Sequence, residues 1–219
     1  MRVLIATKNK GKFGEIHGVL RDLPDAEFVF LGDLVEELGA SGVTFDDSDF
    51  EEDGETHREN AYKKADYYRR KVGEGFDYVL GEDSGIYIDA LADELGIETR
   101  RWGAGHDASD EEWLEHFMGV MEERAAEDFE RGAKFVCSAC LVEGGGNEGE
   151  VEEYFEGETA GAITRNVASE VLPGLPLSSV FLADGFGKVY AVLSQEEKNE
   201  ISHRGQAVSK LKGWFGRKI

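Results

Sequence analysis

One stretch, residues 81–91 (GEDSGIYIDAL), constrains the fold of this chain more than any other. The apolar residues 78–80 lead directly into it, which predicts a buried strand that carries Glu82 and Asp83 at its end. A Ser-Gly pair then predicts a sharp turn, because glycine adopts backbone conformations that other residues avoid. Two adjacent carboxylates repel each other, so the pair indicates a bound Mg²⁺ ion or a raised pKa. A solvated acidic turn is the alternative interpretation.

Strand-like and helical patterns alternate along the chain, which predicts an α/β fold. Residues 34–50 are acidic and weakly patterned, so we expect them to form a connection. A glycine-rich loop at residues 144–149 is expected to join two strands of a hairpin. The predicted strands, besides the central one, are residues 2–6, 27–31, 133–142, 150–155, 157–163, 180–182 and 188–192. The predicted helices begin near residues 13, 56, 109 and 195, and the last one extends to residue 211.

The chain has 219 residues with no internal repeat or linker, so we expect one domain spanning residues 1–219. No apolar run approaches the roughly 18 residues that cross a bilayer. The short apolar segment near the N-terminus ends at Thr7, which does not fit a signal peptide. Cys137 and Cys140 lie in a strand-like run and are interpreted as two buried thiols, with a redox pair as the alternative. Together these features predict a cytoplasmic protein.

Acidic residues dominate the charge of the chain. It carries 24 basic and 46 acidic residues, for a formal net charge of −22. Such a charge repels nucleic acid polymers and anionic membranes, so we expect neither as a partner. The acidic residues are spread along the chain and do not form a tail. We interpret this distribution as a halophilic adaptation, in which dispersed carboxylates keep the protein hydrated in concentrated salt. An acidic partner-binding surface is the alternative.

A polar loop with three lysines follows the first predicted strand and precedes the first predicted helix. Its residues include Thr7, Lys8, Asn9, Lys10 and Lys12. Backbone N–H groups and ammonium groups at a helix N-terminus attract anions, which predicts phosphate binding here. The spacing of a P-loop is absent. Solvated surface lysines are the alternative.

A second candidate segment lies around residue 56. Glu52 precedes a helix that is predicted to begin with Thr56 as N-cap and Glu59 completing a capping box. Lys63 and Lys64 lie on that helix. A carboxylate before the helix and a lysine on it indicate a shared phosphate–metal site, whereas an exposed ion pair of little energetic value is the alternative.

The last predicted helix carries Lys198 and the sequence Ser202-His203-Arg204. Imidazole and guanidinium groups are planar hydrogen-bond donors, and they suit recognition of a purine edge. Cations from this helix and from the lysine-rich loop suit a polyphosphate, while the acids at separate positions suit a metal ion.

Four blocks of the chain, in order, resemble one known family. They read ATKNKGKFGEI, EEDGETHRENAYKKA, GEDSGIYIDAL and EEKNEISHRGQA, and they are similar to motifs of the inosine/xanthosine triphosphate pyrophosphatases. That family hydrolyses deaminated purine nucleotides such as ITP, dITP and XTP. The resemblance implies an elongated mixed β-sheet flanked by helices, with two lobes around a central cleft, in a protein that is usually a homodimer. It also implies Mg²⁺-dependent hydrolysis of a nucleoside triphosphate to the monophosphate and pyrophosphate.

The resemblance also assigns roles to individual residues. Glu52 and Asp83 would hold Mg²⁺ with help from Glu82, and Asp83 would also activate the attacking water. The lysine-rich loop would hold the phosphates, and the late Ser-His-Arg sequence would contact the base. The residues assigned to the substrate are Thr7, Lys8, Asn9, Lys10, Lys12, Lys64, Ser84, Lys198, Ser202, His203 and Arg204.

One block departs from the family. Where the family carries Gly-Phe-Gly-(Tyr/Trp)-Asp-Pro, residues 174–179 read Gly-Leu-Pro-Leu-Ser-Ser, so Leu175 and Leu177 replace aromatic residues and Ser178 replaces the acid. Aromatic stacking contributes about 0.5–1.5 kcal/mol beyond buried area, and losing a polar base contact relaxes discrimination further. The altered loop, residues 175–178, leaves two alternatives open: a pyrophosphatase acting on modified pyrimidine nucleotides, or a nucleotide-binding protein without turnover. His57 also stands where the family usually has an aromatic residue.

Overall fold

The computed structural model describes residues 1–92, 94–105, 107–145 and 151–218 of the chain. The strands are β1 (Arg2–Ile5), β2 (Glu27–Phe30), β3 (Tyr78–Ile88), β4 (Gly132–Glu143), β5 (Val151–Ile163) and β6 (Phe181–Ala183). The α-helices are α1 (Lys10–Leu20), α2 (Leu31–Ala40), α3 (His57–Val72), α4 (Asp110–Arg124), α5 (Gln195–Ile201) and α6 (His203–Lys218).

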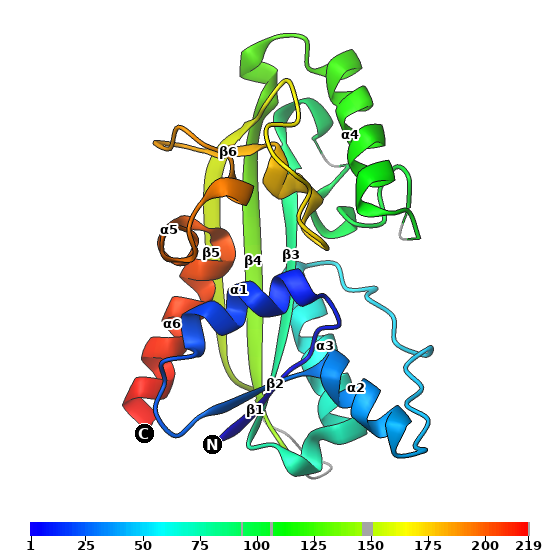
Figure 1. The fold of residues 1–219 in the computed structure, drawn as a ribbon, viewed down its shortest axis with the longest axis vertical. Coiled ribbons are helices and arrows are strands. Elements are labelled where there is room, and N and C mark those ends of the chain that lie inside the picture. The colour runs from blue at the N-terminus through cyan, green and yellow to red at the C-terminus, as the bar shows by residue number, and fades with distance from the viewer. Residues whose placement is uncertain (93, 106, 146–150, 219) are drawn as a thin grey trace.

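Within this part of the chain the strands form one six-stranded sheet in the order β2-β1-β3-β4-β5-β6. β1 pairs in parallel with β2 and β3, and the other neighbours are antiparallel. β3, β4 and β5 run along the length of the molecule, with α4 and β6 beside one end and α1, α2 and α3 toward the other (Figure 1). The predicted α/β fold with an elongated, mixed, helix-flanked sheet is therefore confirmed. The division into two lobes stays a prediction.

The helices cover both faces of the sheet. On one face, α1 and α6 pack through an apolar cluster that includes Ile16, Leu80 and other buried residues. On the opposite face, α3 packs through a second cluster that includes Ala61 and Val79. A third cluster around Trp113 fills the space beside α4. Because successive strand residues point to opposite faces, neighbours on β3 contact different helices.

The pairing of β1 with β3 stops early. Its last pair is Ile5 with Leu80, whereas β3 continues to Ile88. Beyond Leu80, β3 pairs only with β4 among the described strands, so one edge of β3 lies open beside the carboxyl end of β1. Ligands of α/β sheets bind outside the carboxyl ends of parallel strands. The topology therefore predicts a ligand-binding site at this edge.

The turn that we predicted after Glu82 and Asp83 is wrong, because β3 runs straight through Ser84 and Gly85. Two glycines of this strand allow neighbouring backbone segments to pack closely against it. A Cβ atom at Gly81 would overlap the carbonyl oxygen of Ala61 on α3, and one at Gly85 would overlap the carbonyl oxygen of Gly96. Gly81 is thus needed for α3 to lie directly against β3, and Gly85 for the backbone at Gly96 to do so.

Several other predicted boundaries need correction. The connection expected at residues 34–50 begins with α2, since part of its acidic sequence forms a helix with Leu31 buried against the core. The strand expected at residues 188–192 is a 3₁₀ turn, Tyr190–Val192. The strands expected on either side of residue 156 are one strand, β5, paired along β4. The helix expected at residues 195–211 is broken at Ser202, whose extended backbone separates α5 from α6. Residues 146–149 of the predicted hairpin loop, and residue 150 of the strand predicted after it, lie outside the described part of the chain.

The predicted start of α3 is half correct. The Thr56 hydroxyl accepts a hydrogen bond from the Glu59 N–H at 3.1 Å, but the Glu59 carboxylate accepts from the N–H of Glu55, at 2.7 Å. The two cysteines are free and buried, as interpreted, and they belong to apolar clusters on opposite faces of β4. No helix among the described residues has the length and apolar character required to span a bilayer.

Candidate active site

A cavity of ≈ 890 Å³ lies at the open edge of β3. It extends from the loop between β1 and α1 to the segment at residues 173–178. A second cavity, of ≈ 770 Å³, lies along α4 and contains none of the predicted site residues. The predicted residues that line the first cavity are Thr7, Lys8, Asn9, Lys10, Lys12, Glu52, Lys64, Asp83, Ser84, His203 and Arg204.

The remaining predicted residues lie elsewhere. Glu82 is buried beneath the cavity, at 3% exposure. Lys198 lies on α5 and does not line the cavity. The Ser202 hydroxyl accepts the Gly205 N–H at 2.9 Å, so it caps the start of α6. The resemblance assigned these three side chains to the metal or the substrate, and none of them lines the cavity.

The loop before α1 is held rigidly at the cavity wall. The Asn9 carboxamide caps α1 by accepting the Lys12 N–H at 3.0 Å, and its Nδ2 donates to Gly174 O at 2.9 Å. Lys8 pairs with Asp47 at 2.6 Å. The first turn of α1 contains no acidic residue, so its N–H groups and positive dipole end remain favourable for an anion.

A buried ion network fixes the base of the site. Lys12 Nζ lies 2.9 Å from Glu82 Oε2, and Arg204 Nε donates to Glu82 Oε1 at 3.1 Å. Arg204 also pairs with Glu15 and donates to Ser84 Oγ at 2.8 Å. Burial alone would raise the pKa of Glu82, but the charges of Arg204 and the lysines hold it well below its ordinary value. Glu82 is thus an anion neutralised by protein cations.

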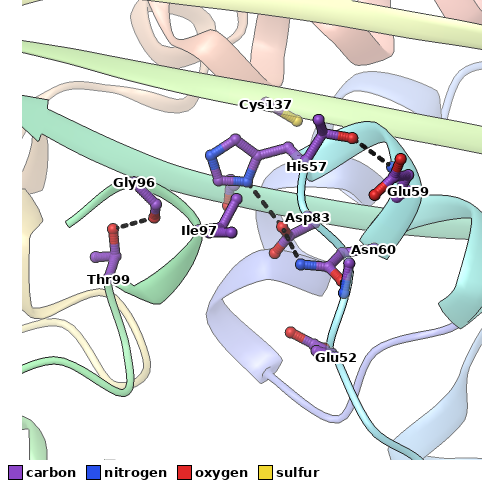
Figure 2. Close-up of polar contacts among 12 residues, drawn as sticks. Glu52, His57, Glu59, Asn60, Asp83, Gly96, Ile97, Thr99 and Cys137 are labelled. Carbon is purple, nitrogen blue, oxygen red and sulfur yellow. Dashed lines mark hydrogen bonds and ion pairs between the residues drawn. The ribbon is translucent and has the colours of Figure 1, made fainter. Parts of the chain in front are cut away.

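Asp83 points to the opposite face of β3, toward α3 (Figure 2). Its Oδ2 accepts hydrogen bonds from His57 Nδ1 at 2.7 Å and from Asn60 Nδ2 at 3.4 Å. Burial would raise the pKa of this carboxyl group, but the His57 hydrogen bond and the charges of Lys12 and Lys64 lower it. No hydrogen bond from the described residues reaches Oδ1. Asp83 is therefore an anion with one oxygen held and one free for a ligand.

Glu52 approaches the same region from the segment before α3. Its Oε1 lies 2.6 Å from Lys64 Nζ, which also donates to the backbone oxygen of Glu82 at 3.0 Å. Arg101 Nη1 donates to the Glu52 backbone oxygen at 2.9 Å and anchors that segment. Burial would lower the pKa of Lys64, but the surrounding carboxylates, first Glu52 and then Asp83, raise it. A cationic group already lies among these carboxylates, which indicates that positive charge is favoured there.

The donor set suits Mg²⁺ bound together with substrate. The described residues contain no cluster of three or more His, Cys, Asp or Glu side chains in metal-binding geometry. Mg²⁺ is, however, usually held by one or two carboxylates together with waters and substrate phosphates. Glu52 and Asp83 supply two carboxylates to one cavity that is also lined by the N-terminal end of α1. These residues fit the ion, whereas Glu82 is already occupied by cations.

The far end of the cavity is apolar and aromatic. His203 is 4% exposed and stacks on Phe135, with ring centroids 4.6 Å apart and planes at 8°. Leu175, Leu177 and Ser178 line the same end. The side chains that replace the family's aromatic and acidic residues thus form part of the wall that a nucleotide base would contact.

Comparisons with known proteins relate this chain to one family. A sequence model of the Ham1 family matches residues 3–214. The chain belongs to the Ham1 family. A protein of Caldanaerobacter subterraneus subsp. tengcongensis, named dITP/XTP pyrophosphatase, is 35% identical over 100% of this chain and 98% of its own length. One of the same name from Geobacter sulfurreducens is 34% identical over 98% of each chain.

Solved Ham1 structures share the fold. The Ham1 protein of Coxiella burnetii superposes with a TM-score of 0.74 at 29% identity, covering 99% of both chains. The Ham1 protein of Staphylococcus aureus superposes with a TM-score of 0.71 at 28% identity, covering 100% of both chains. The predicted family and the α/β fold are therefore confirmed.

In this Ham1 family member, the sequence left five contributors to the site unassigned. Each of them either contacts another side chain of the site or lines the cavity. None of them therefore stood out in the sequence as part of a cluster of charges. Helical spacing was the signal for two of them, since Glu15 follows Lys12 by one turn and Asn60 precedes Lys64 by one turn. The residues are Glu15, His57, Asn60, Arg101 and Phe135.

Proposed function

We propose that this chain is an Mg²⁺-dependent nucleoside triphosphate pyrophosphatase. Its substrates are deaminated purine nucleotides, ITP, dITP and XTP, and its products are the monophosphate and pyrophosphate. One observation supports the proposal above all: residues at the N-terminal end of α1 line the same cavity as Glu52 and Asp83. The names of the relatives, dITP/XTP pyrophosphatase, support the same activity.

The residues that line the cavity have different roles in the proposed reaction. The α1 N-terminus, Lys12 and Lys64 attract and orient the triphosphate, which places the scissile phosphorus beside Asp83. Glu52 and Asp83 would hold Mg²⁺, which when bound neutralises phosphate charge. The free Oδ1 of Asp83 is the oxygen that accepts a hydrogen bond from the attacking water. Its lowered pKa suits holding a cation and orienting water better than storing a proton.

Base recognition rests on His203 and on the altered loop at residues 175–178. His203 offers a polar ring stacked on Phe135, while the leucines of the loop offer apolar contact but no stacking. A pyrophosphatase acting on modified pyrimidines remains the second candidate, because the loop lacks the family's acidic partner for the base.

A substrate panel tests the activity. Pyrophosphate release should be fastest with ITP, dITP and XTP and much slower with ATP, GTP and a methylated UTP. A clear preference for methylated UTP would overturn the purine assignment. Failure to turn over any nucleotide, with nucleotide binding retained, would instead identify a binding protein.

Replacing Glu52 with glutamine should raise the Mg²⁺ concentration that gives half-maximal activity by about tenfold or more, because one of two anionic ligands becomes neutral. Binding of nucleotide should change less. The matched control is Asp53→Asn, one residue on, whose exposed carboxylate pairs with Lys63 at 2.8 Å. An unaltered Mg²⁺ titration in the Glu52 variant would reject Glu52 as a ligand.

We further propose that the enzyme is one domain over residues 1–219, forms a homodimer and works in the cytoplasm, where its substrates are found. Its net charge of −22 supports the absence of nucleic acid or membrane partners and a salt-adapted surface.

Salt screens repulsion among exposed carboxylates, so the Tm of this protein should rise from dilute buffer to molar KCl. Thermal unfolding at increasing KCl checks this, and an unchanged Tm would reject the halophilic interpretation. Light scattering of the purified protein tests the dimer.

A further inference from the structure

His57 is the first residue of α3, and its side chain reaches Asp83 (Figure 2). The residue is 8% exposed, and its Nδ1 lies 2.7 Å from Asp83 Oδ2. A Cβ atom at Gly85 would lie 2.9 Å from His57 Cε1, so the ring lies directly on β3. The imidazole therefore has little room to turn away from the carboxylate.

The other ring nitrogen of His57 also has a partner. The hydroxyl of Tyr87 lies 3.4 Å from His57 Nε2, and the two rings meet edge to face at 87°. An ionised aspartate only accepts hydrogen bonds, so Nδ1 carries a proton toward Asp83. The Tyr87 hydroxyl lies on the other side of the ring, beside Nε2. The three side chains thus form a chain of contacts from Tyr87 through His57 to Asp83.

These contacts decide which oxygen of Asp83 is left for a ligand. His57 and Asn60 both donate to Oδ2, and their bonds fix the carboxylate plane. Of the two, the His57 bond is much the shorter. Partners behind a ligating carboxylate orient it, and removing such a partner typically costs 10- to 100-fold in metal affinity or activity.

We propose that His57 is a positioning residue for Asp83 that turns Oδ1 toward the substrate and its metal ion. The inference rests on the proposed function of Asp83. His57 itself touches neither substrate nor metal, and its effect is expected in turnover and metal affinity more than in nucleotide binding.

Three variants separate positioning from packing. His57→Phe keeps a flat ring against β3 but removes the donor, so kcat for the best substrate should fall about 10- to 100-fold with little change in KM. His57→Asn places an amide N–H near the Nδ1 position and should recover most of the lost kcat. Tyr87→Phe removes only the hydroxyl and should cause a smaller loss than His57→Phe.

A metal-binding measurement gives a readout that does not depend on turnover. Binding of Mn²⁺ in the presence of an α,β-methylene analogue of ITP, followed by electron paramagnetic resonance, should weaken about tenfold or more in His57→Phe and far less in His57→Asn. A wild type that binds Mn²⁺ but hydrolyses no nucleotide would reject the proposed function while the variants still decide the role of His57.

The two readouts fail in distinguishable ways. An unchanged kcat and an unchanged Mn²⁺ affinity in His57→Phe would overturn the proposal. So would equal losses in His57→Phe and His57→Asn accompanied by matching falls in Tm, because that pattern describes a residue that only holds α3 in place.

Discussion

Replacing Asp83 with asparagine is expected to lower kcat by about 10²- to 10⁴-fold, the range for losing a group that handles the proton of an attacking water. The amide oxygen of the new side chain can still accept the hydrogen bonds of His57 and Asn60. The amide NH₂ would then face the cavity, where it can neither ligate a cation nor accept a hydrogen bond from the attacking water. Steady-state pyrophosphate release measures the loss.

A matched control for this variant is Asp89→Asn. Asp89 is an exposed carboxylate that directly follows the end of the same strand, and it lies outside the cavity. It should retain wild-type kcat. Calorimetric titration with nucleotide should show that Asp83→Asn still binds, since the α1 end of the cavity is untouched. A kcat within a few-fold of wild type in Asp83→Asn would remove Asp83 from the mechanism.

Replacing Arg204 with methionine is expected to lower the free energy of unfolding by about 3–5 kcal/mol, because it removes one of the two cations beside the buried Glu82 and the partner of Glu15. Arg204 is 3% exposed and contacts Glu82, Glu15 and the Ser84 hydroxyl. Methionine fills much of the same volume, so the loss reports charge more than packing. Urea unfolding followed by circular dichroism measures it.

Two comparisons isolate the ionic contribution. Adding Glu82→Gln to Arg204→Met should recover part of the loss, because the buried charge is removed together with its partner. Arg124→Met, which breaks an exposed pair with Glu94, should cost at most about 1 kcal/mol. Equal losses in the two arginine variants would contradict the importance of the buried network.

The sign of the pH dependence follows from Glu82, whose pKa is held well below its ordinary value in the folded protein. Its contribution to stability is complete above the unfolded pKa, about 4.3, and is lost as pH falls through the lower folded pKa. The unfolding free energy of the wild type should therefore fall in acid more steeply than that of Glu82→Gln.

Alternation of side chains on β3 explains both what the sequence predicted and what it missed. The apolar run and the two acids were enough to predict a buried strand that carries both carboxylates, but not that the strand continues past them. Neighbouring strand residues face opposite sides, so Glu82 meets α1 and α6 while Asp83 meets α3. The two carboxylates are adjacent in the sequence motif. Their partners differ because the two side chains lie on opposite faces of the strand.

The misplaced turn has a similar origin. A glycine can be required because the backbone adopts an unusual conformation, or because another segment packs too closely for a side chain. The sequence alone does not distinguish these two reasons. Gly85 belongs to the second kind, since its contact, Gly96, is eleven residues away. The acidic sequence of α2 was likewise ambiguous, because its helix depends on burial of Leu31 that no local pattern reveals.

The segment at residues 173–178 is tied to the rest of the site through Gly174, whose carbonyl accepts from Asn9 and whose N–H donates to Asp110. The groups proposed to handle phosphate and metal lie on α1, on β3, on α3 and in the segment before α3 instead. Substitutions in this segment can therefore accumulate without disturbing bond cleavage. A lineage could exchange one nucleobase for another while inheriting the hydrolytic apparatus intact, and grafted loops should transfer preference between members of the family.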